Sequence, residues 1–140
     1  MSARFAPVYF TDENTLGLGK LLHRSGRTDV VYPGHAGLPQ VPLGSLDLEW
    51  MPAVGALGLI VITRDRRIRT RPAELIAYRE HGIRCVWIGA KQDLRPQEQV
   101  DLFLKHEERL RREIIKLGAG PWAVALTTSG VRPLPIKSSD

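Results

Sequence analysis

Residues 59–67 read Leu-Ile-Val-Ile-Thr-Arg-Asp-Arg-Arg, an apolar run that ends in one acid among arginines. The β-branched run predicts a buried strand over 59–63, so Asp65 lies just beyond its carboxyl end. Residues 8–12, Val-Tyr-Phe-Thr-Asp, repeat this arrangement and place Asp12 after a strand of its own. Because open parallel sheets build their sites at the carboxyl ends of strands, we expect Asp12 and Asp65 to share one edge of a sheet.

Strand and helix signals alternate along the chain, which is the pattern of a parallel sheet covered by helices. The expected strands are 8–11, 29–32, 59–63, 84–89 and 122–127, and the expected helices are 16–23, a segment capped by Ser45 or Asp47 and running to about 57, 72 to about 81, and 96–117. Prolines at 72 and 96 suit the first position of a helix. The pattern predicts an α/β fold with a central parallel sheet of about 4–5 strands covered by helices.

The segment from Pro33 to Ser45 interrupts this alternation. It holds three glycines and three prolines, a composition that resists regular structure. We therefore expect an irregular loop, either a binding or gating loop or a simple connector.

Length and composition indicate one domain over 1–128 and a tail over 129–140 with too little apolar material to fold on its own. The chain has no apolar run of membrane-spanning length and no signal-like N-terminus, so we expect a cytoplasmic protein without a membrane partner. The single cysteine, Cys85, excludes an internal disulfide and a thiolate metal cluster. A net charge of +5 favours polyanionic partners but does not identify one.

A third acid, Asp47, stands in the segment Ser-Leu-Asp-Leu-Glu-Trp at 45–50. Carboxylates gathered at one sheet edge repel one another unless a cation joins them. Mg²⁺ binds through a few carboxylates and keeps positions open for water and phosphate. The three acids therefore predict a divalent metal site that acts on phosphate. The alternative is that Asp65 only caps a turn and Asp47 only caps its helix.

Three motifs together resemble a known family. Asp12-Glu13-Asn14 after the first strand, the Asp-x-Glu-Trp helix start, and Val-Ile-Thr-Arg-Asp-Arg-Arg-Ile-Arg followed by Arg-Pro-Ala-Glu are similar to the compact PIN-like domains grouped with VapC toxins, over residues 8 to about 90. The resemblance implies an α/β/α sandwich and a metal-dependent endoribonuclease that uses Mg²⁺ or Mn²⁺ to hydrolyse RNA phosphodiester bonds. It also implies a cognate antitoxin as inhibitor. PIN domains commonly pair, so a homodimer or a hetero-oligomer with the antitoxin is expected, and Leu38, Val41 and Leu43 offer an apolar surface for it.

The family's catalytic and metal-binding acids match three positions of this chain: Asp12, Asp47 and Asp65. Ordinary PIN domains add another acid between the first two. The candidate between Glu13 and Asp47 is Asp29, which begins a strand and so belongs to the opposite sheet edge. Glu13 or Glu49 remains as a possible replacement ligand, and a strict two-metal mechanism is in doubt.

The residues around Asp65 predict contacts to substrate. Thr63 is expected to orient the substrate or a carboxylate through its hydroxyl. The neighbouring arginines carry donors suited to phosphate, and they are Arg64, Arg66, Arg67, Arg69 and Arg71. The alternative is a solvated, charged loop without a ligand.

Two other classes of function stay open. One is a PIN-like module that has lost catalysis and binds nucleic acid or protein. The other is a receiver-type phospho-acceptor domain, in which Asp12, Glu13, Asp65 and Lys91 would form the phosphorylation site. In that second class five arginines beside the phospho-acceptor loop would be unusual, and Lys91 follows the fourth expected strand rather than the fifth.

Overall fold

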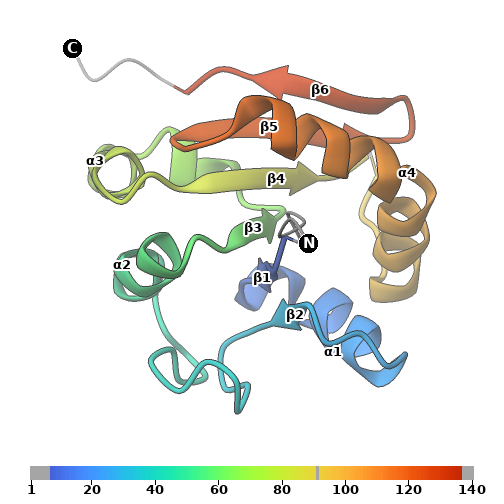
Figure 1. Ribbon diagram of the computed structural model, residues 1–140, viewed down its shortest axis with the longest axis horizontal. Helices are drawn as coiled ribbons and strands as arrows, with labels where there is room; N and C mark the ends of the chain where they lie inside the picture. Colours follow the sequence, from blue (N-terminus) through green and yellow to red (C-terminus); the bar gives the residue numbers. More distant parts are fainter. Residues whose placement is uncertain (1–6, 91, 137–140) are drawn as a thin grey trace, which may run out of the picture.

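The computed structural model describes residues 7–90 and 92–136, except for the side chain of Arg69. Within these described residues, six strands and four α-helices follow one another along the chain (Figure 1). The strands are β1 (Tyr9–Thr11), β2 (Val30–Val31), β3 (Ile60–Thr63), β4 (Arg84–Ile88), β5 (Trp122–Thr127) and β6 (Gly130–Leu134). The helices are α1 (Leu16–Arg24), α2 (Asp47–Leu57), α3 (Pro72–Glu80) and α4 (Pro96–Leu117), with short 3₁₀ helices η1 (Glu13–Thr15) and η2 (Arg66–Arg69).

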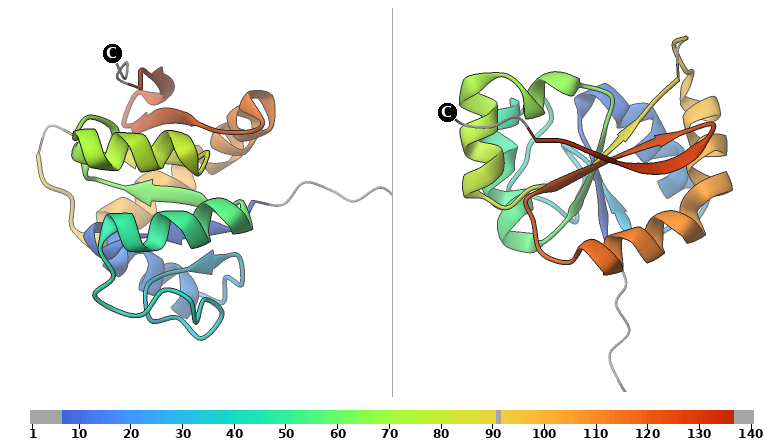
Figure 2. Two further views of the ribbon diagram at one scale, coloured as in Figure 1. Left: turned by 90° about the vertical axis from the view of Figure 1, so that its left-hand side faces the viewer. Right: turned by 90° about the horizontal axis from the view of Figure 1, so that it is seen from above.

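The six strands form one sheet in the order β2-β1-β3-β4-β5-β6. The first five strands are parallel, and β6 pairs with β5 in the antiparallel direction. Helices α1 and α4 cover one face of the sheet, and α2 and α3 cover the other (Figures 1 and 2). The expected three-layer α/β/α sandwich is therefore confirmed, although the central sheet has six described strands and not about 4–5, because β6 adds an antiparallel strand beside β5.

The core has two halves because successive residues of a strand point to opposite faces of the sheet. In β3, Ile60 and Ile62 pack toward α1 and α4, whereas Val61 packs toward α2 and α3. Since both faces are covered, the strand is apolar throughout, which explains the unbroken run of aliphatic residues in its sequence.

The long connector from Pro33 to Ser45 has no helix or strand, as expected, but its apolar residues do not form a free surface. Leu38 and Val41 are 1% exposed and pack with Trp50 in the core under α2. Leu43 alone of the three expected interface residues is exposed, at 64%. The prediction of a three-residue pairing surface is therefore wrong for Leu38 and Val41, which fasten the connector to the domain.

The capping of α2 also differs from expectation. The helix begins at Asp47, but its N-cap is Leu46. The Leu46 N–H donates a hydrogen bond of 2.7 Å to the Glu49 carboxylate. Ser45 instead donates its hydroxyl to Pro42 O. A glutamate at the third helical position can satisfy a free amide from inside the helix, so the N-cap itself needs no polar side chain.

The tail expected over 129–140 is not wholly separate from the domain, because residues 130–134 form β6, whereas residues 137–140 lie outside the described residues. The backbone turns back after Thr127, and β6 runs along β5 with Val131 opposite Leu126. Val131 adds to the core on the α4 side. The pairing supplies from β5 the apolar partner that the tail lacks in its own sequence.

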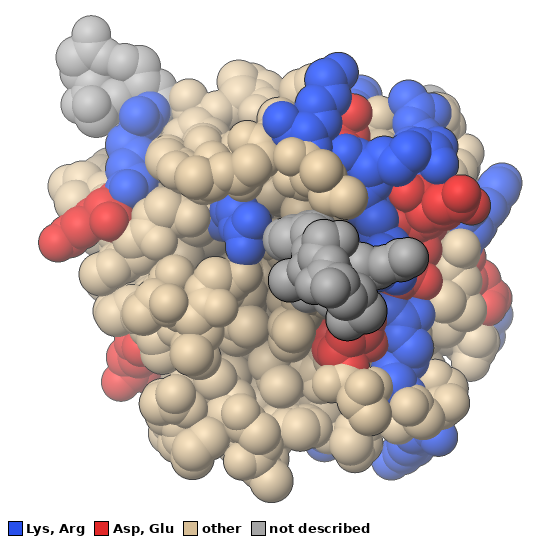
Figure 3. Space-filling model, in the orientation of Figure 1, with Lys and Arg blue, Asp and Glu red and all other residues tan. Residues whose placement is uncertain are grey.

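Charged side chains are unevenly distributed over the face of the molecule that Figure 3 shows. In Figure 3, Lys and Arg cluster over the α4 side with acids among them, whereas the lower part of the same view, over α2 and the 33–46 connector, is mostly uncharged. None of the helices in the described part of the chain has both the length and the apolar character that crossing a membrane requires.

Candidate active site

Asp12 lies at the carboxyl end of β1 and is 3% exposed. Its Oδ1 accepts hydrogen bonds from the Thr15 backbone N–H at 3.2 Å and from the Thr15 hydroxyl at 3.0 Å. Its Oδ2 accepts a bond of 2.6 Å from the Thr63 hydroxyl. Burial raises the pKa of Asp12 to about 6, and the nearby charge of Asp47 adds to the rise, although the hydrogen bonds from Thr63 and Thr15 oppose it.

Asp47 enters the site from the first turn of α2. Its Oδ1 accepts a hydrogen bond of 3.2 Å from the Trp50 indole N–H, three residues further along the helix. Burial raises the pKa of Asp47, and the charges of Asp65 and Glu74 raise it further. Two of the three acids therefore carry raised pKa values, as expected for carboxylates crowded in a partly buried site.

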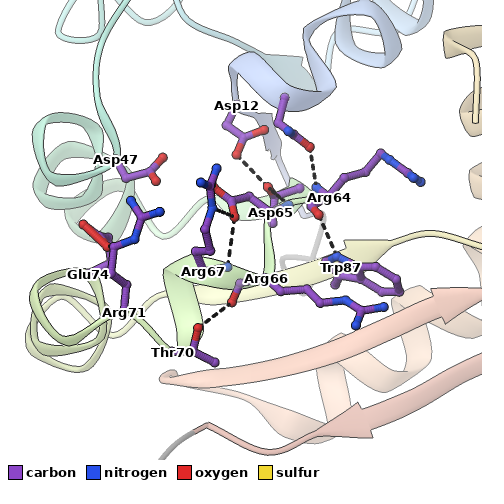
Figure 4. Close-up of polar contacts among 12 residues, drawn as sticks. Asp12, Asp47, Arg64, Asp65, Arg66, Arg67, Thr70, Arg71, Glu74 and Trp87 are labelled. Atoms are coloured by element: carbon purple, nitrogen blue, oxygen red, sulfur yellow. Dashed lines mark hydrogen bonds and ion pairs between the residues drawn. The ribbon is translucent and has the colours of Figure 1, made fainter. Parts of the chain in front are cut away.

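Asp65 follows β3 and caps the short helix η2. Its Oδ1 accepts from the Arg67 backbone N–H and from Arg67 Nε, both at 2.9 Å. Burial acts to raise the pKa of Asp65, but the contacts with Arg67 outweigh it and lower the pKa. Figure 4 shows the Arg67 side chain extending beside Asp65 on the side that faces Asp47. The Arg67 guanidinium therefore balances part of the negative charge of the acidic site.

Thr63 joins two of these acids. It is 0% exposed, donates its hydroxyl hydrogen to Asp12 Oδ2, and accepts a bond of 3.0 Å from the Asp65 N–H. Thr63 thus orients the Asp12 carboxylate through its hydroxyl and holds Asp65 through the backbone. A side chain with no exposed surface does not reach a substrate, so the other half of that expectation has no support here.

The three acids line one pocket of about 350 Å³ at the carboxyl edge of the sheet. The residues that line it are Asp12, Glu13, Asn14, Ser45, Asp47, Trp50 and Asp65. Within the described residues, however, no group of three or more His, Cys, Asp or Glu side chains is arranged closely enough to hold a metal ion. The acids surround a common space without forming a closed ligand set.

The two candidate replacement acids differ in position. Glu13 lines the pocket, and its Oε1 accepts a hydrogen bond of 2.5 Å from the Gly44 N–H. Glu49 does not line the pocket, because its carboxylate is turned back to cap α2 at Leu46. Of the two, Glu13 is placed to assist the three aspartates. Asp29 lies at the opposite end of the sheet, before β2, and pairs with Arg27.

Glu74, in the first turn of α3, is a buried acid near the site that was not among the predicted site residues. It is 9% exposed, and Oε2 has no hydrogen-bond partner within the described residues, with Arg71 Nε 3.5 Å away. Its charge raises the pKa of Asp47. The sequence did offer one signal for this burial, because Glu74 lies on the same face of α3 as the buried residues Leu75 and Tyr78.

Thr15, Asn14 and Trp50 were also missed. Thr15 stands three residues after Asp12 at a strand-to-helix junction, which is a capping pattern that the sequence does display. The Asn14 side-chain oxygen accepts from the Arg64 N–H at 3.1 Å and so ties the turn after β1 to the turn after β3. Trp50 holds Asp47, as described above.

The arginines near Asp65 point in different directions. Arg64 extends away from the pocket toward Ile88 O, at 3.3 Å, and Asp93, at 3.8 Å. Arg66 lies over the Trp87 ring, 4.5 Å from its centroid. Arg67 contacts Asp65, and Arg71 lies beside Glu74. The arginines that were expected to bind phosphate therefore do not form one group around the pocket. The side chain of Arg69 lies outside the described structure. Lys91, expected only for a receiver domain, also lies outside it.

The fold is an α/β/α sandwich with acids from three separate segments at the carboxyl edge of a mostly parallel sheet. Residues 7–90 match the family model described as PIN like domain, and the chain belongs to this family. PIN-like domains are generally nucleases. Comparisons with curated proteins and with solved structures gave no match.

Proposed function

We propose that the protein is a metal-dependent endoribonuclease that hydrolyses RNA phosphodiester bonds, as a toxin of the VapC type. The observation that carries this proposal is the pocket lined by Asp12, Asp47 and Asp65, in a chain that belongs to the PIN-like family. These acids come from β1, α2 and the turn after β3, so the fold itself brings them together. No single motif would do so.

The chemistry of the donor set fits a hard divalent cation. Carboxylate oxygens are the ligands that Mg²⁺ and Mn²⁺ prefer. Burial, with a smaller contribution from neighbouring acids, raises the pKa of Asp12 and Asp47 and so disfavours their charged forms, which a bound cation would stabilise. We infer that Asp12, Asp47 and Asp65 would hold the ion, with Glu13 nearby. When bound, such an ion supplies an activated water and stabilises charge on the phosphate oxygens.

The protein's own residues prepare this site. Thr63 and Thr15 fix the orientation of the Asp12 carboxylate through hydrogen bonds to both of its oxygens. The Trp50 indole does the same for Asp47. Arg67 balances the charge of Asp65 and, by turning toward solvent, would release that carboxylate and offer its guanidinium to a phosphate. Its side chain is 65% exposed and therefore has room to turn.

A cytoplasmic location and inhibition by a cognate antitoxin are parts of the same proposal. Leu43, Leu46 and Leu48 are 64%, 69% and 45% exposed beside the pocket-lining residues Ser45 and Asp47. Exposed leucines near a catalytic pocket support binding of a protein partner that would cover it.

A specific observation favours a second candidate, the PIN-like module that binds nucleic acid or protein without cleaving it. Within the described residues the acids do not converge into a metal ligand set, and Arg67 occupies one of them. In this alternative, Arg67 would be a permanent replacement for the cation.

The two candidates are separated by one assay. The full chain is incubated with a labelled single-stranded RNA in Mg²⁺, in Mn²⁺ and in EDTA, and Asp12→Asn and Asp65→Asn are compared with Asp101→Asn, a matched change on the exposed face of α4. The nuclease predicts cleavage with either metal, none in EDTA, and loss of at least 100-fold in both site variants, which keep wild-type circular dichroism. Absence of cleavage by the wild-type chain would leave the binding module, and unchanged cleavage in Asp12→Asn would show that the acidic pocket is not where RNA is cut.

A further inference from the structure

A second pocket, of about 640 Å³, opens at the carboxyl ends of β4 and β5. Arg66, Trp87, Gln92, Thr127, Ser129 and Arg132 are among the residues that line it. It differs in character from the acidic pocket, because it holds two guanidinium groups and several hydroxyls and no Asp or Glu is among the residues that line it. Half of its wall belongs to the β5–β6 hairpin, which lies beyond the part of the chain that the family model matches.

The sheet register links the two pockets. Thr63 pairs with Trp87, Trp87 with Ala125, and Ala125 with Arg132. Directly paired residues on neighbouring strands point to the same face of a sheet. Thr63, which holds Asp12, therefore begins a row that ends at Arg132, roughly 14 Å away across three strand spacings. Ala125 contributes only a methyl group to this row, so it leaves space between Trp87 and Arg132.

Trp87 is held in a fixed position inside this pocket. Its indole N–H donates a hydrogen bond of 2.9 Å to Arg64 O. Its ring lies so close to Gly89 that any side chain at position 89 would clash with it. The Arg66 guanidinium rests over the ring in a cation–π contact (Figure 4). Because Trp87 is only 9% exposed, it acts as a support for Arg66, not as an open platform for a base.

Arg66 and Arg132 are both exposed, and within residues 7–90 and 92–136 neither forms an ion pair. A guanidinium that is positioned by an aromatic ring and left without an anion has its donors free for a ligand. Phosphate is the ligand that such a fork suits best, and the hydroxyls of Thr127 and Ser129 add neutral donors.

We propose that this pocket binds a backbone phosphate of single-stranded RNA, to one side of the bond that is cut at the acidic pocket. The identity of the polymer rests on the proposed function. The phosphate contact supplies binding and register, since contacts to the backbone position a nucleic acid without reading its sequence. The acidic pocket alone repels RNA, so a neighbouring cationic pocket would hold the strand across it.

The test is fluorescence anisotropy of a labelled 12-nucleotide single-stranded RNA with the full chain in EDTA, where hydrolysis is suppressed. The variants are Arg132→Ala and Arg66→Ala, and the matched control is Arg112→Ala on the exposed surface of α4, which changes the net charge equally. We expect each pocket variant to weaken binding about tenfold at low salt and to reduce the slope of log K against log salt by about 1. Arg112→Ala should stay within about twofold of wild type.

Cleavage by the same proteins is measured in parallel with Mg²⁺. If RNA is cut but both pocket variants bind as wild type does, or if Arg112→Ala loses as much affinity as they do, the phosphate pocket is overturned while the nuclease stands. If RNA is bound through Arg66 and Arg132 but never cut, the proposed hydrolysis fails while the pocket stands. Thermal melting confirms that each exposed-site variant is folded.

Discussion

The Thr63 hydroxyl donates a 2.6 Å hydrogen bond to Asp12 Oδ2 across the neighbouring strands β3 and β1. The Thr63 hydroxyl oxygen also accepts a hydrogen bond from the Asp65 N–H. One buried threonine therefore sets the positions of two acids that lie 53 residues apart in the chain, from 12 to 65. Neither strand could shift along the other by one residue without breaking this link, because every side chain would then change face.

Replacing this threonine tests its effect on Asp12. In Thr63→Val the shape is kept but the hydrogen bond that lowers the pKa of Asp12 is lost, so that pKa rises above its present value of about 6. The acid limb of the cleavage pH profile should move to higher pH, with a larger loss of activity at pH 6 than at pH 8. Thr28→Val, an exposed change, serves as control. An unmoved acid limb would show that Asp12 does not govern it.

The raised pKa of Asp12 has a consequence for folding stability. The folded state holds the Asp12 proton to higher pH than the unfolded state, for which the pKa is near 3.8. This group therefore favours the folded state below about pH 4, and its contribution falls as pH rises to about 6 and is flat above.

Asp12→Asn removes the buried charge and should raise the free energy of unfolding at pH 7 by about 1–3 kcal/mol in metal-free buffer, with no gain at pH 3.5. Urea denaturation at the two pH values measures this difference. Addition of Mg²⁺ should raise the Tm of the wild-type chain and leave that of Asp12→Asn nearly unchanged. A variant less stable than wild type at pH 7 contradicts the assigned pKa direction.

Arg67 and a metal ion compete for Asp65 if the proposed site is correct. Arg67→Ala should tighten Mn²⁺ binding about threefold to tenfold, measured by calorimetry, because Asp65 no longer pairs with a guanidinium. The effect on Tm should be small, since exposed ion pairs contribute little. Lys116→Ala removes a cation at the far end of α4 and should leave Mn²⁺ affinity unchanged. Weaker binding in Arg67→Ala would mean that Arg67 supports the cation site.

A separate ion cluster fastens α4 to the start of β2. Arg27 contacts Asp29 at 2.8 Å and Glu107 at 2.5 Å and is 23% exposed. The hydrogen bond from Arg27 is the largest cause of the lowered pKa of Asp29, so this stabilisation is present near neutral pH and is lost as pH falls below about 4.

Arg27→Ala leaves two partly buried carboxylates without a partner and should lower the free energy of unfolding at pH 7 by about 1–3 kcal/mol. The loss should shrink at pH 3, where the carboxylates are protonated. Arg112→Ala, with its exposed partner Glu108, should change stability by less than about 0.5 kcal/mol in the same denaturation series.

The sequence predicted the helices best where prolines mark their start. Helix α4 begins at Pro96 and ends at Leu117, and α3 begins at Pro72, as expected from the fixed backbone angle of proline. The parallel order of the sheet followed from alternating strand and helix signals. Strand β6 was missed because its five residues, Gly-Val-Arg-Pro-Leu, have little strand propensity, and only pairing with β5 makes them a strand.

The candidate site was predictable in its acids but not in their partners. Asp12 and Asp65 could be placed because each follows an apolar strand. The contact of Arg67 with Asp65 and the burial of Glu74 depend on side-chain packing between η2, α2 and α3, which no periodicity in the sequence encodes. The alignment of Trp87 with Arg132 depends on a hairpin that the sequence pattern did not reveal.

Strand β6 covers β5, which would otherwise be an edge strand able to pair with other chains. Without it, β5 would present six mostly apolar residues and a row of unpaired backbone groups to solvent, which is a template for intermolecular pairing. Pro133 in β6 has no N–H to donate, and Arg132 adds charge, so the strand that takes the outer position is itself a poor template. A chain ending at residue 128 should therefore aggregate, as size-exclusion chromatography would reveal.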